Sequence, residues 1–311
     1  MPSNLAKVAG LSAGSALLAI SFPYVVKLSA PLLSLVPDLQ MPDYAFPIPF
    51  LKTAETETEP PPFVCDTSHS YKTELVSLDP LVVYIHSLLT PVETSSLLST
   101  AEPLFAPSEV IKHGRELRTK DRTSSSAGLP GNDPVVECVL ARARRFMGTM
   151  MRDGWDEMGP TQLVRYSAAG QRFNLHHDWY DSPRQSVGTG DSRKWNRLAS
   201  FFAILQDNCT GGETHFPFVE GAAPPSPWGD EIWGGEVEEG EGRGEEEGRS
   251  LPLWRAHEDG GLAFRPVAGN AIFWVNLHPN GTGDMRTMHA GLPLGDGLKT
   301  AMNIWPRRYY R

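Results

Sequence analysis

The chain has 311 residues, 40% of them hydrophobic, which is enough to bury the core of one sizeable domain with appendages. Its formal net charge of −9 comes almost entirely from Asp230 to Gly248, where nine acidic residues accompany one arginine. The rest of the chain is close to neutral, which argues against a nucleic-acid-binding protein with a basic face. Cys65, Cys138 and Cys209 allow one disulfide but form no CxxC pair, so a zinc cluster built on cysteine is not supported.

The N-terminal region predicts a membrane anchor or a signal segment. Val8 to Val26 is uncharged, has a lysine on each side, and is long enough for a single membrane span. We therefore expect residues 1–30 to anchor the protein in the endoplasmic reticulum membrane as a single pass, with the body of the chain in the lumen; secretion after signal cleavage is the alternative. A mitochondrial presequence is disfavoured because this region contains no arginine. Sequons at Asn208 and Asn280 are compatible with a lumenal body.

The next segments predict a linker, a strand and a helix. Residues 31–78 are rich in Pro, Thr and Glu, which is typical of a linker. Leu81 to Ile85 is apolar and β-branched, and we expect a strand there. A helix should then run to about Ala101, because the N-cap Thr90 is followed by a first-turn proline and by the glutamate of a capping box.

A second helix should open at Asp133 and Pro134. Its apolar residues recur at helical spacing and predict one buried face, formed by Val136, Val139, Leu140, Ala143, Met147 and Met150. Beyond Gly159 the pattern changes to short β segments separated by Gly and Pro turns. The expected strands are Thr161 to Ser167, Ala199 to Gln206, Leu262 to Arg265, Asn270 to Leu277, and Lys299 to Trp305. Many short strands of this kind predict a closed or double-sheet β architecture.

An acidic insertion at about residues 219–261 interrupts these strands. Its Gly, Pro and Glu content predicts a solvated, mobile loop. Three tryptophans, Trp228, Trp233 and Trp254, suggest that parts of it dock on the body of the protein.

His176 and Asp178 lie two positions apart in a segment expected to be extended, so their side chains should project to the same side. His289, 111 positions beyond Asp178, offers a second imidazole on a strand that a β-sandwich would bring alongside. Two histidines and one carboxylate on one face of a metal leave its other positions open, the arrangement used by non-haem iron(II) oxygenases. By itself, however, an HxD triplet is also common as a surface pair without metal.

The sequence around these residues contains five ordered blocks. They are Arg122-Thr-Ser124, the run YSAAGQRFNLHHD from Tyr166 to Asp178, GGETHFP at 211–217, HAGLPLGDGLK at 289–299, and Asn303-Ile-Trp305. Over roughly Asp79 to Arg311, this series resembles the prolyl 4-hydroxylase family.

The resemblance implies that residues 79–311 form an iron(II)- and 2-oxoglutarate-dependent dioxygenase domain. Its fold class would be mainly β with flanking helices (α+β), around a double-stranded β-helix, or jelly roll. The expected activity is hydroxylation of prolyl residues in a peptide or protein substrate by O2, with release of succinate and CO2 and with support from L-ascorbate. No nucleic acid is expected as a partner.

The resemblance also implies site residues. Carried over by position, His176, Asp178 and His289 would be the iron ligands and the catalytic centre. Lys299, ten residues past the distal histidine, would pair with the far carboxylate of 2-oxoglutarate, a role that suits a buried cation in need of an anion. Tyr166 would donate a hydrogen bond to the same carboxylate.

Three positions depart from the family pattern without altering an expected metal ligand. Tyr166 precedes His176 by ten residues, one more than in the collagen-type enzymes. Phe173 stands where a tyrosine is usual, and Leu175 where a proline is usual.

Several other residues near these blocks have plainer interpretations. Trp305 is expected to form a wall of the pocket or core, and Thr214 to lie near the site or simply in a strand. His177 should point away from His176, because neighbours in an extended chain alternate in direction. We expect a group of histidines not to bind metal: His177, His215, His257 and His278.

Two alternative functions remain open at this point. A hydrolase can bind zinc through two histidines and a carboxylate as well, although it would not need Lys299 at its spacing from His289. A membrane-anchored binding protein with a degenerate oxygenase site is the second alternative, and retention of the three ligands and Lys299 argues against it.

Overall fold

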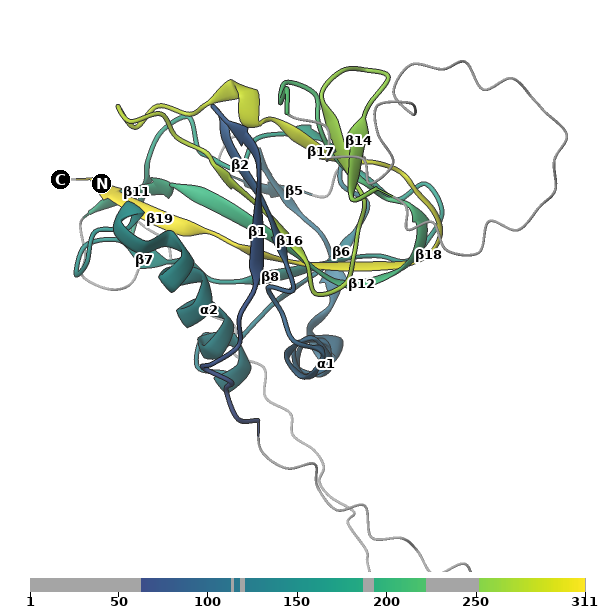
Figure 1. The fold of residues 1–311 in the computed structure, drawn as a ribbon, viewed down its shortest axis with the longest axis horizontal. Coiled ribbons are helices and arrows are strands. Elements are labelled where there is room, and N and C mark those ends of the chain that lie inside the picture. The colour runs from purple at the N-terminus through teal and green to yellow at the C-terminus, as the bar shows by residue number, and fades with distance from the viewer. Residues whose placement is uncertain (1–62, 113–114, 118–120, 187–192, 222–251, 311) are drawn as a thin grey trace, which may run out of the picture. The chain divides into compact units, whose positions relative to one another are not determined.

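The computed structural model describes residues 63–112, 115–117, 121–186, 193–221 and 252–310 (Figure 1). The expected anchor segment, residues 31–62 of the expected linker, the acidic run, Trp228 and Trp233 lie outside the described residues. Among the residues described, no helix is long and apolar enough to cross a membrane.

The described chain is built on two larger antiparallel sheets. The first has eight strands, in the spatial order β1 (Lys72–Leu78), β2 (Leu81–His86), β16 (Ala271–Val275), β12 (Ala199–Gly211), β18 (Leu294–Ile304), β8 (Gln162–Tyr166), β6 (Ser125–Gly128) and β3 (Ala106–Pro107). The second has five, in the order β14 (Trp254–Ala256), β15 (Leu262–Phe264), β13 (Thr214–Phe216), β17 (His289–Gly291) and β9 (Phe173–His176). Together they form the expected double-stranded β-helix.

Smaller elements extend this framework. A four-stranded sheet has the order β10 (Arg184–Gln185), β11 (Lys194–Arg197), β19 (Pro306–Tyr310) and β7 (Glu157–Met158), and β4 (Val110–Lys112) pairs with β5 (Arg115–Leu117). The two α-helices are α1 (Pro91–Ala101) and α2 (Pro134–Met147). Short 3₁₀ turns are η1 (Glu102–Leu104), η2 (Gly148–Met150) and η4 (Met285–Thr287).

Alternate residues of β18 face opposite layers of the protein, as the period of two in a strand requires. Met302 and Ile304 pack into the core beneath the helices, and both are fully buried. Lys299 and Asn303 face the other way, toward the second sheet, where Asn303 lines a pocket. The eight-stranded sheet therefore has one apolar face for the helices and one face that carries polar side chains such as Lys299 and Asn303.

The helices begin where the sequence predicts. At α1 the capping box is complete: Thr90 Oγ1 accepts from the Glu93 backbone N–H at 3.1 Å, and the Glu93 carboxylate accepts from the Thr90 backbone N–H at 2.9 Å. The predicted apolar face of α2 is buried against the sheet. Arg142 on that face forms a two-pronged ion pair with Glu93, at 2.6 and 2.5 Å, which joins the two helices inside the core.

Two boundaries differ from expectation. Strand β1 lies within the predicted linker, because its alternating residues pair with β2 and bury Val76. The folded body therefore starts before Asp79. Strand β14 lies within the predicted insertion, where Trp254 is buried against Tyr84 and Phe264. Docking of this tryptophan is confirmed, and the Glu-rich composition around it had obscured a short strand.

One disulfide joins Cys65 to Cys138 across 73 positions. It ties the segment before β1 to α2. Cys209 is a free, half-buried thiol.

Candidate active site

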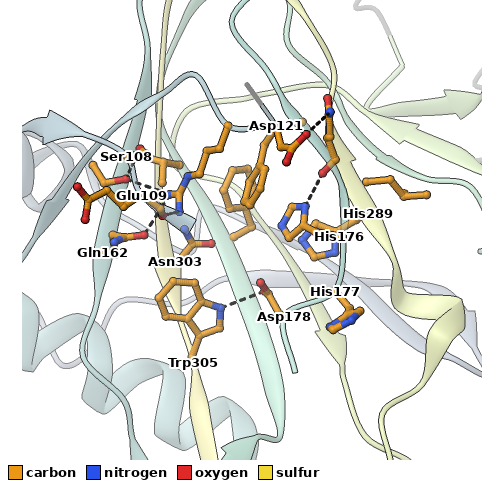
Figure 2. Close-up of a pocket in the computed structure, with 18 of the residues that line it drawn as sticks. Ser108, Glu109, Asp121, Gln162, His176, His177, Asp178, His289, Asn303 and Trp305 are labelled. Carbon is orange, nitrogen blue, oxygen red and sulfur yellow. Dashed lines mark hydrogen bonds between the residues drawn. The ribbon is translucent and has the colours of Figure 1, made fainter. Parts of the chain in front are cut away.

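Three side chains capable of binding metal converge at one end of the five-stranded sheet (Figure 2). His176 ends β9 and His289 begins β17, and the two residues are direct partners in the antiparallel pairing of these strands. Asp178 follows β9 by two residues. Their donor atoms all lie within 4.8 Å of one another, and among the described residues no other such group of three occurs. Metal bonds of about 2 Å place the ligand atoms of one ion within about 4 Å of one another, so small side-chain movements would let the three share a metal.

Backbone carbonyls fix the orientation of both imidazoles. Nδ1 of His176 lies 2.8 Å from the Asn174 carbonyl oxygen, and Nδ1 of His289 lies 3.0 Å from that of Thr287. A carbonyl only accepts, so each Nδ1 carries the proton and donates it. This arrangement leaves both Nε2 lone pairs available to a metal.

The Asp178 carboxylate is held through one of its oxygens. Its Oδ2 accepts from the Ser200 hydroxyl at 2.7 Å and from the Trp305 indole N–H at 3.0 Å. Asn276 in turn donates to the Ser200 oxygen at 2.9 Å. The other oxygen, Oδ1, lies 3.7 Å from the Arg197 guanidinium and accepts no hydrogen bond within the described chain, which leaves it free for a metal.

The protonation states suit a metal site. Burial lowers the pKa of His176 to about 3, with the nearby His289 as the second cause, and burial also lowers the pKa of His289. For Asp178 burial acts in the opposite direction, but His289, Arg197 and His176 outweigh it and hold its pKa below the usual range. At neutral pH the imidazoles are thus neutral and the carboxylate is ionised, as metal ligands must be.

Lys299 is a buried cation next to Tyr166 and Phe202. It is 1% exposed and lies opposite Tyr166 in the β18–β8 pairing. Its Nζ donates to the Gly212 carbonyl and lies 5.7 and 5.2 Å from the ring centres of Tyr166 and Phe202. No carboxylate of the described chain lies within ion-pair distance, and burial lowers its pKa to about 8. A buried ammonium without an anion is costly, so the site is suited to an anionic ligand.

The turn before β13 positions the acceptor for Lys299. Gly211 and Gly212 both have positive φ, +64° and +69°, a conformation that side chains rarely adopt. A Cβ on Gly212 would also lie 3.0 Å from the Leu294 Cδ1, a tight contact that glycine avoids.

A pocket of about 1260 Å³ opens over the three metal-binding side chains. Tyr166 and Phe202, which flank Lys299, form part of its wall, and the metal-binding residues form another part. Thr214 also lines it.

Residues 161–307 match the family described as the 2OG-Fe(II) oxygenase superfamily. Probable prolyl 4-hydroxylase 8 and prolyl 4-hydroxylase 5 of Arabidopsis thaliana are each 28% identical to the chain over 235 residues, which is 75% of this chain and 70% of each relative. The chain is a prolyl 4-hydroxylase-like 2-oxoglutarate oxygenase.

Two further proteins are similar to this prolyl 4-hydroxylase-like oxygenase. Prolyl 4-hydroxylase subunit alpha-3 of Homo sapiens is 26% identical over 237 residues, 76% of this chain but 35% of that subunit. Among solved structures, the viral collagen prolyl hydroxylase from Paramecium Bursaria Chlorella virus-1 is 20% identical, with a TM-score of 0.47 and coverage of 73% and 96% of the two chains.

The pocket of the prolyl 4-hydroxylase-like oxygenase also has a polar part of its wall, around Arg122. Arg122 lies over the Phe173 ring at 4.8 Å, and donates to Ser126 at 2.9 Å and to Gln162 at 3.1 Å. Trp305 forms a further wall, with the Arg197 guanidinium 3.6 Å from its ring centre.

Other histidines of this oxygenase do not belong to the metal-binding group, although His177 lines the same pocket. His177 stacks on Trp179 with ring centres 3.8 Å apart, and its Nδ1 lies 2.8 Å from the Trp179 carbonyl oxygen. His215 forms a hydrogen bond between its Nε2 and the Gly260 carbonyl at 2.7 Å. His278 lies 3.8 Å from the Asp284 carboxylate.

Sequence reasoning missed the residues that hold Asp178 in place. Ser200 lies in β12 and Asn276 directly follows β16, and neither belongs to a distinctive motif. Only their inward direction in the fold brings Ser200 to the carboxylate and Asn276 to Ser200. Arg197 was missed for the same reason. Arg122 and Trp305 were singled out by the family-like blocks, but the contacts that they make could not be inferred from spacing alone.

Proposed function

We propose that this oxygenase hydroxylates prolyl residues of peptide or protein substrates, consuming O2 and 2-oxoglutarate and releasing succinate and CO2. One observation carries the proposal: a neutral, pre-oriented pair of imidazoles and an ionised carboxylate line a pocket whose wall includes Tyr166 and Phe202. These two rings flank a buried lysine that has no anionic partner among the described residues.

The donor set fits iron(II). Nε2 of His176, Nε2 of His289 and Oδ1 of Asp178 would hold the ion, with its remaining positions open to the pocket. When bound, iron(II) with 2-oxoglutarate supplies the oxidising power that puts one oxygen atom of O2 into a substrate C–H bond and the other into succinate. The backbone carbonyls at Asn174 and Thr287 keep the imidazoles aimed at the ion.

The cosubstrate has a matching anion site. Lys299 would bind the carboxylate of 2-oxoglutarate that lies farther from the metal, which gives the buried ammonium its missing anion. Tyr166, buried next to Lys299, would donate its hydroxyl to the same carboxylate. Burial raises the pKa of Tyr166, so its hydroxyl keeps its proton at neutral pH.

The pocket is larger than 2-oxoglutarate requires, since a volume of about 1260 Å³ exceeds that of most small-molecule sites. The excess is suited to a peptide. Aromatic walls favour the compact, apolar ring of proline, and the polyproline II conformation leaves backbone carbonyls free to accept hydrogen bonds. Arg122 and Arg197 are placed on the pocket wall to donate them.

A labelled-carbon assay tests the function. We expect the protein, supplied with iron(II), ascorbate and labelled 2-oxoglutarate, to release labelled CO2 faster with one or more members of a panel of proline-containing peptides. Mass spectrometry should then show one added oxygen on a prolyl residue. Asp178→Ala is the inactive control, because it removes a ligand.

Two other results would favour the alternative functions. Peptide cleavage with added zinc and no 2-oxoglutarate consumption would indicate a hydrolase. Tight peptide binding without turnover, in protein that retains bound iron, would indicate a binding protein. Lys299 separates the first alternative from our proposal, because peptide hydrolysis at a zinc ion has no use for a buried dicarboxylate-binding cation.

We further propose that ascorbate sustains turnover by keeping the metal reduced. During 2-oxoglutarate turnover without peptide, activity should decay within the assay when ascorbate is omitted and recover when it is added.

We also propose that the protein acts in the lumen of the endoplasmic reticulum, held on the membrane by residues 8–26. The disulfide between Cys65 and Cys138 supports an oxidising compartment, because cytosolic proteins seldom keep such bonds. Carbonate extraction should leave the protein with the membrane, and the body should resist protease added to sealed microsomes. Secretion of a shortened chain would support signal cleavage instead.

A further inference from the structure

The chain contains two N-glycosylation sequons, Asn208-Cys-Thr and Asn280-Gly-Thr, and the structure presents them very differently. Asn280 lies in the connection between β16 and β17, which projects from the sheets at the upper left of Figure 1. Asn208 lies within β12, paired with β18. Carbohydrate transfer requires an asparagine that an enzyme can reach together with the hydroxyl two residues on, so the two sites can be ranked.

The Asn280 sequon occupies the tip of a tight turn. Leu277 and Gly283 form an isolated antiparallel bridge at its base, and the His278 N–H donates to the Thr282 carbonyl at 2.8 Å. Asn280 and Thr282 are both exposed. The acceptor tripeptide is therefore presented at the surface on a closed hairpin, and no strand pairing has to open to expose it.

The middle residue of this sequon holds the turn against the body of the protein. Gly281 has a φ of +87°, and its carbonyl accepts from the Tyr310 hydroxyl at 3.3 Å. A Cβ at this position would lie 3.1 Å from the Tyr310 ring. Glycine therefore lets the backbone lie on the tyrosine while the side chains of Asn280 and Thr282 remain exposed.

The two reactive side chains of the sequon already lie together. Oδ1 of Asn280 accepts from the Thr282 hydroxyl at 2.7 Å and from the Thr282 backbone N–H at 3.0 Å. The amide nitrogen, Nδ2, forms no hydrogen bond within the described chain. On this exposed residue the nucleophilic nitrogen is therefore not engaged by the described chain, while the amide oxygen is held.

Asn208 and Thr210 are exposed as well, so the difference lies in the backbone: this sequon is extended and paired within a sheet. Asn208 is opposite Leu298 in the β12–β18 ladder, and the Thr210 hydroxyl accepts from the Asp296 backbone N–H at 2.9 Å. A reaction at Asn208 in the folded protein would require this pairing to separate first. The hydroxyl of Thr210 already takes part in a hydrogen bond within the folded protein.

We propose that Asn280 is an N-glycosylation site of this protein and that Asn208 is not. The proposal rests on the lumenal location argued above. In the reaction, Asn280 Nδ2 forms a bond to C1 of an oligosaccharide, and C1 loses its bond to the lipid pyrophosphate donor. The amide gives up one proton, and the lipid pyrophosphate is the leaving group.

The position tolerates a bulky group. Asn280 is not part of the wall of the large pocket, so a glycan there leaves the metal-binding residues accessible. A separate hollow of about 690 Å³ has Asn280 and Tyr310 in its wall, which leaves room for the first sugars beside the protein.

The test uses the full chain made in a eukaryotic secretory system, with a reporter sequon added after Arg311. Before and after peptide N-glycosidase, we compare the wild-type chain with Asn280→Gln, Thr282→Ala and the matched control Asn208→Gln. We expect two glycans, one of them on the reporter, in the wild type and the control. Asn280→Gln and Thr282→Ala should each carry only the reporter glycan.

Loss of a glycan in Asn208→Gln, or an unmodified Asn280 beside a modified reporter, would overturn the site assignment while leaving the lumenal location intact. An unmodified reporter would overturn both. Labelled CO2 release, measured on the same samples, reports on the oxygenase proposal separately, and we expect Asn280→Gln to retain full turnover.

Discussion

Replacing Lys299 with methionine should weaken the binding of 2-oxoglutarate. In the protein without bound ligand, it should also remove the energetic cost of a buried charge. The substitution keeps a long unbranched side chain and removes the ammonium. A hydrogen bond to a charged group contributes about 1.5–3 kcal/mol. Its loss should therefore raise the KM for 2-oxoglutarate roughly 10- to 150-fold, at about 1.4 kcal/mol per tenfold. Iron binding should change little, because no metal ligand is removed.

The stability of the empty protein should move in the opposite direction. The pKa of Lys299 falls from its ordinary value of 10.5 to about 8, chiefly through burial. This difference corresponds to roughly 3 kcal/mol of destabilisation when the lysine is charged. Methionine removes that cost but leaves the Gly212 carbonyl without its donor, a loss of about 1–3 kcal/mol. The net change at pH 7 should lie between about 0 and +2 kcal/mol.

The pH dependence of the free energy of unfolding separates the effect of the Lys299 charge from other effects of the substitution. Because the folded pKa is the lower one, the unfolded chain binds the extra proton between about pH 8 and 10.5, and wild-type stability contributed by this group rises over that interval. Urea unfolding of metal-free protein should show this rise in the wild type and lose it in Lys299→Met. The control Lys194→Met, at an exposed lysine, should behave as wild type. An unchanged KM, or a variant with the wild-type pH slope, would refute the reasoning.

Three further variants probe the supports of the site and fold. Trp305→Phe removes one of two donors to Asp178 and should lower iron affinity or turnover about 10- to 100-fold in iron titrations, with secondary structure unchanged. Arg142→Leu leaves a buried carboxylate unpaired and should lower the free energy of unfolding by about 3–5 kcal/mol, whereas exchange of the exposed Arg184 should cost little. Cys138→Ala removes the disulfide that closes a loop of 73 positions to Cys65, and should lower the free energy of unfolding by about 4 kcal/mol. Reductant should destabilise the wild type by a similar amount and leave the variant unchanged.

Each of these has a contradicting result. Wild-type iron affinity and turnover in the tryptophan variant would show that the indole hydrogen bond does not hold the ligand in place. An arginine variant as stable as wild type would mean that the carboxylate is neutral or solvated. If reductant destabilised the wild type and Cys138→Ala equally, reduction of the disulfide would not be the cause of the lost stability.

The parts of the fold that the sequence predicts well are those with strong local signals. The capping box at Thr90 and the apolar stripe of α2 define helices by residue type and spacing alone. The strand from Ala199 was expected to end at Gln206, yet β12 continues to Gly211. Its polar second half remains a strand because β18 pairs with it, and such a partner cannot be inferred from composition.

The metal-binding group could be anticipated because three residues of distinctive chemistry stand within recognisable blocks. His176 and His289 were expected on neighbouring strands, and the structure makes them direct partners. Their supports could not be anticipated. Ser200 reaches Asp178 only because β12 presents it on the inner face, and that direction depends on how the sheets close.

The pairing of β9 with β17 links metal binding to the dynamics of a sheet edge. Strand β9 is the last strand of its sheet, and its pairing with β17 rests on two opposed positions separated by an irregularity. On its other side it is held by one isolated bridge, between Phe173 and Arg122. A bound ion would cross-link His176 on this edge to His289 on its neighbour, and anything that binds only the folded state stabilises it by mass action. Local separation of β9 from β17 would then require the ion to lose one of its ligands. The backbone amides of β9 should therefore exchange more slowly when metal is bound. After chelation, faster exchange should appear first in this strand.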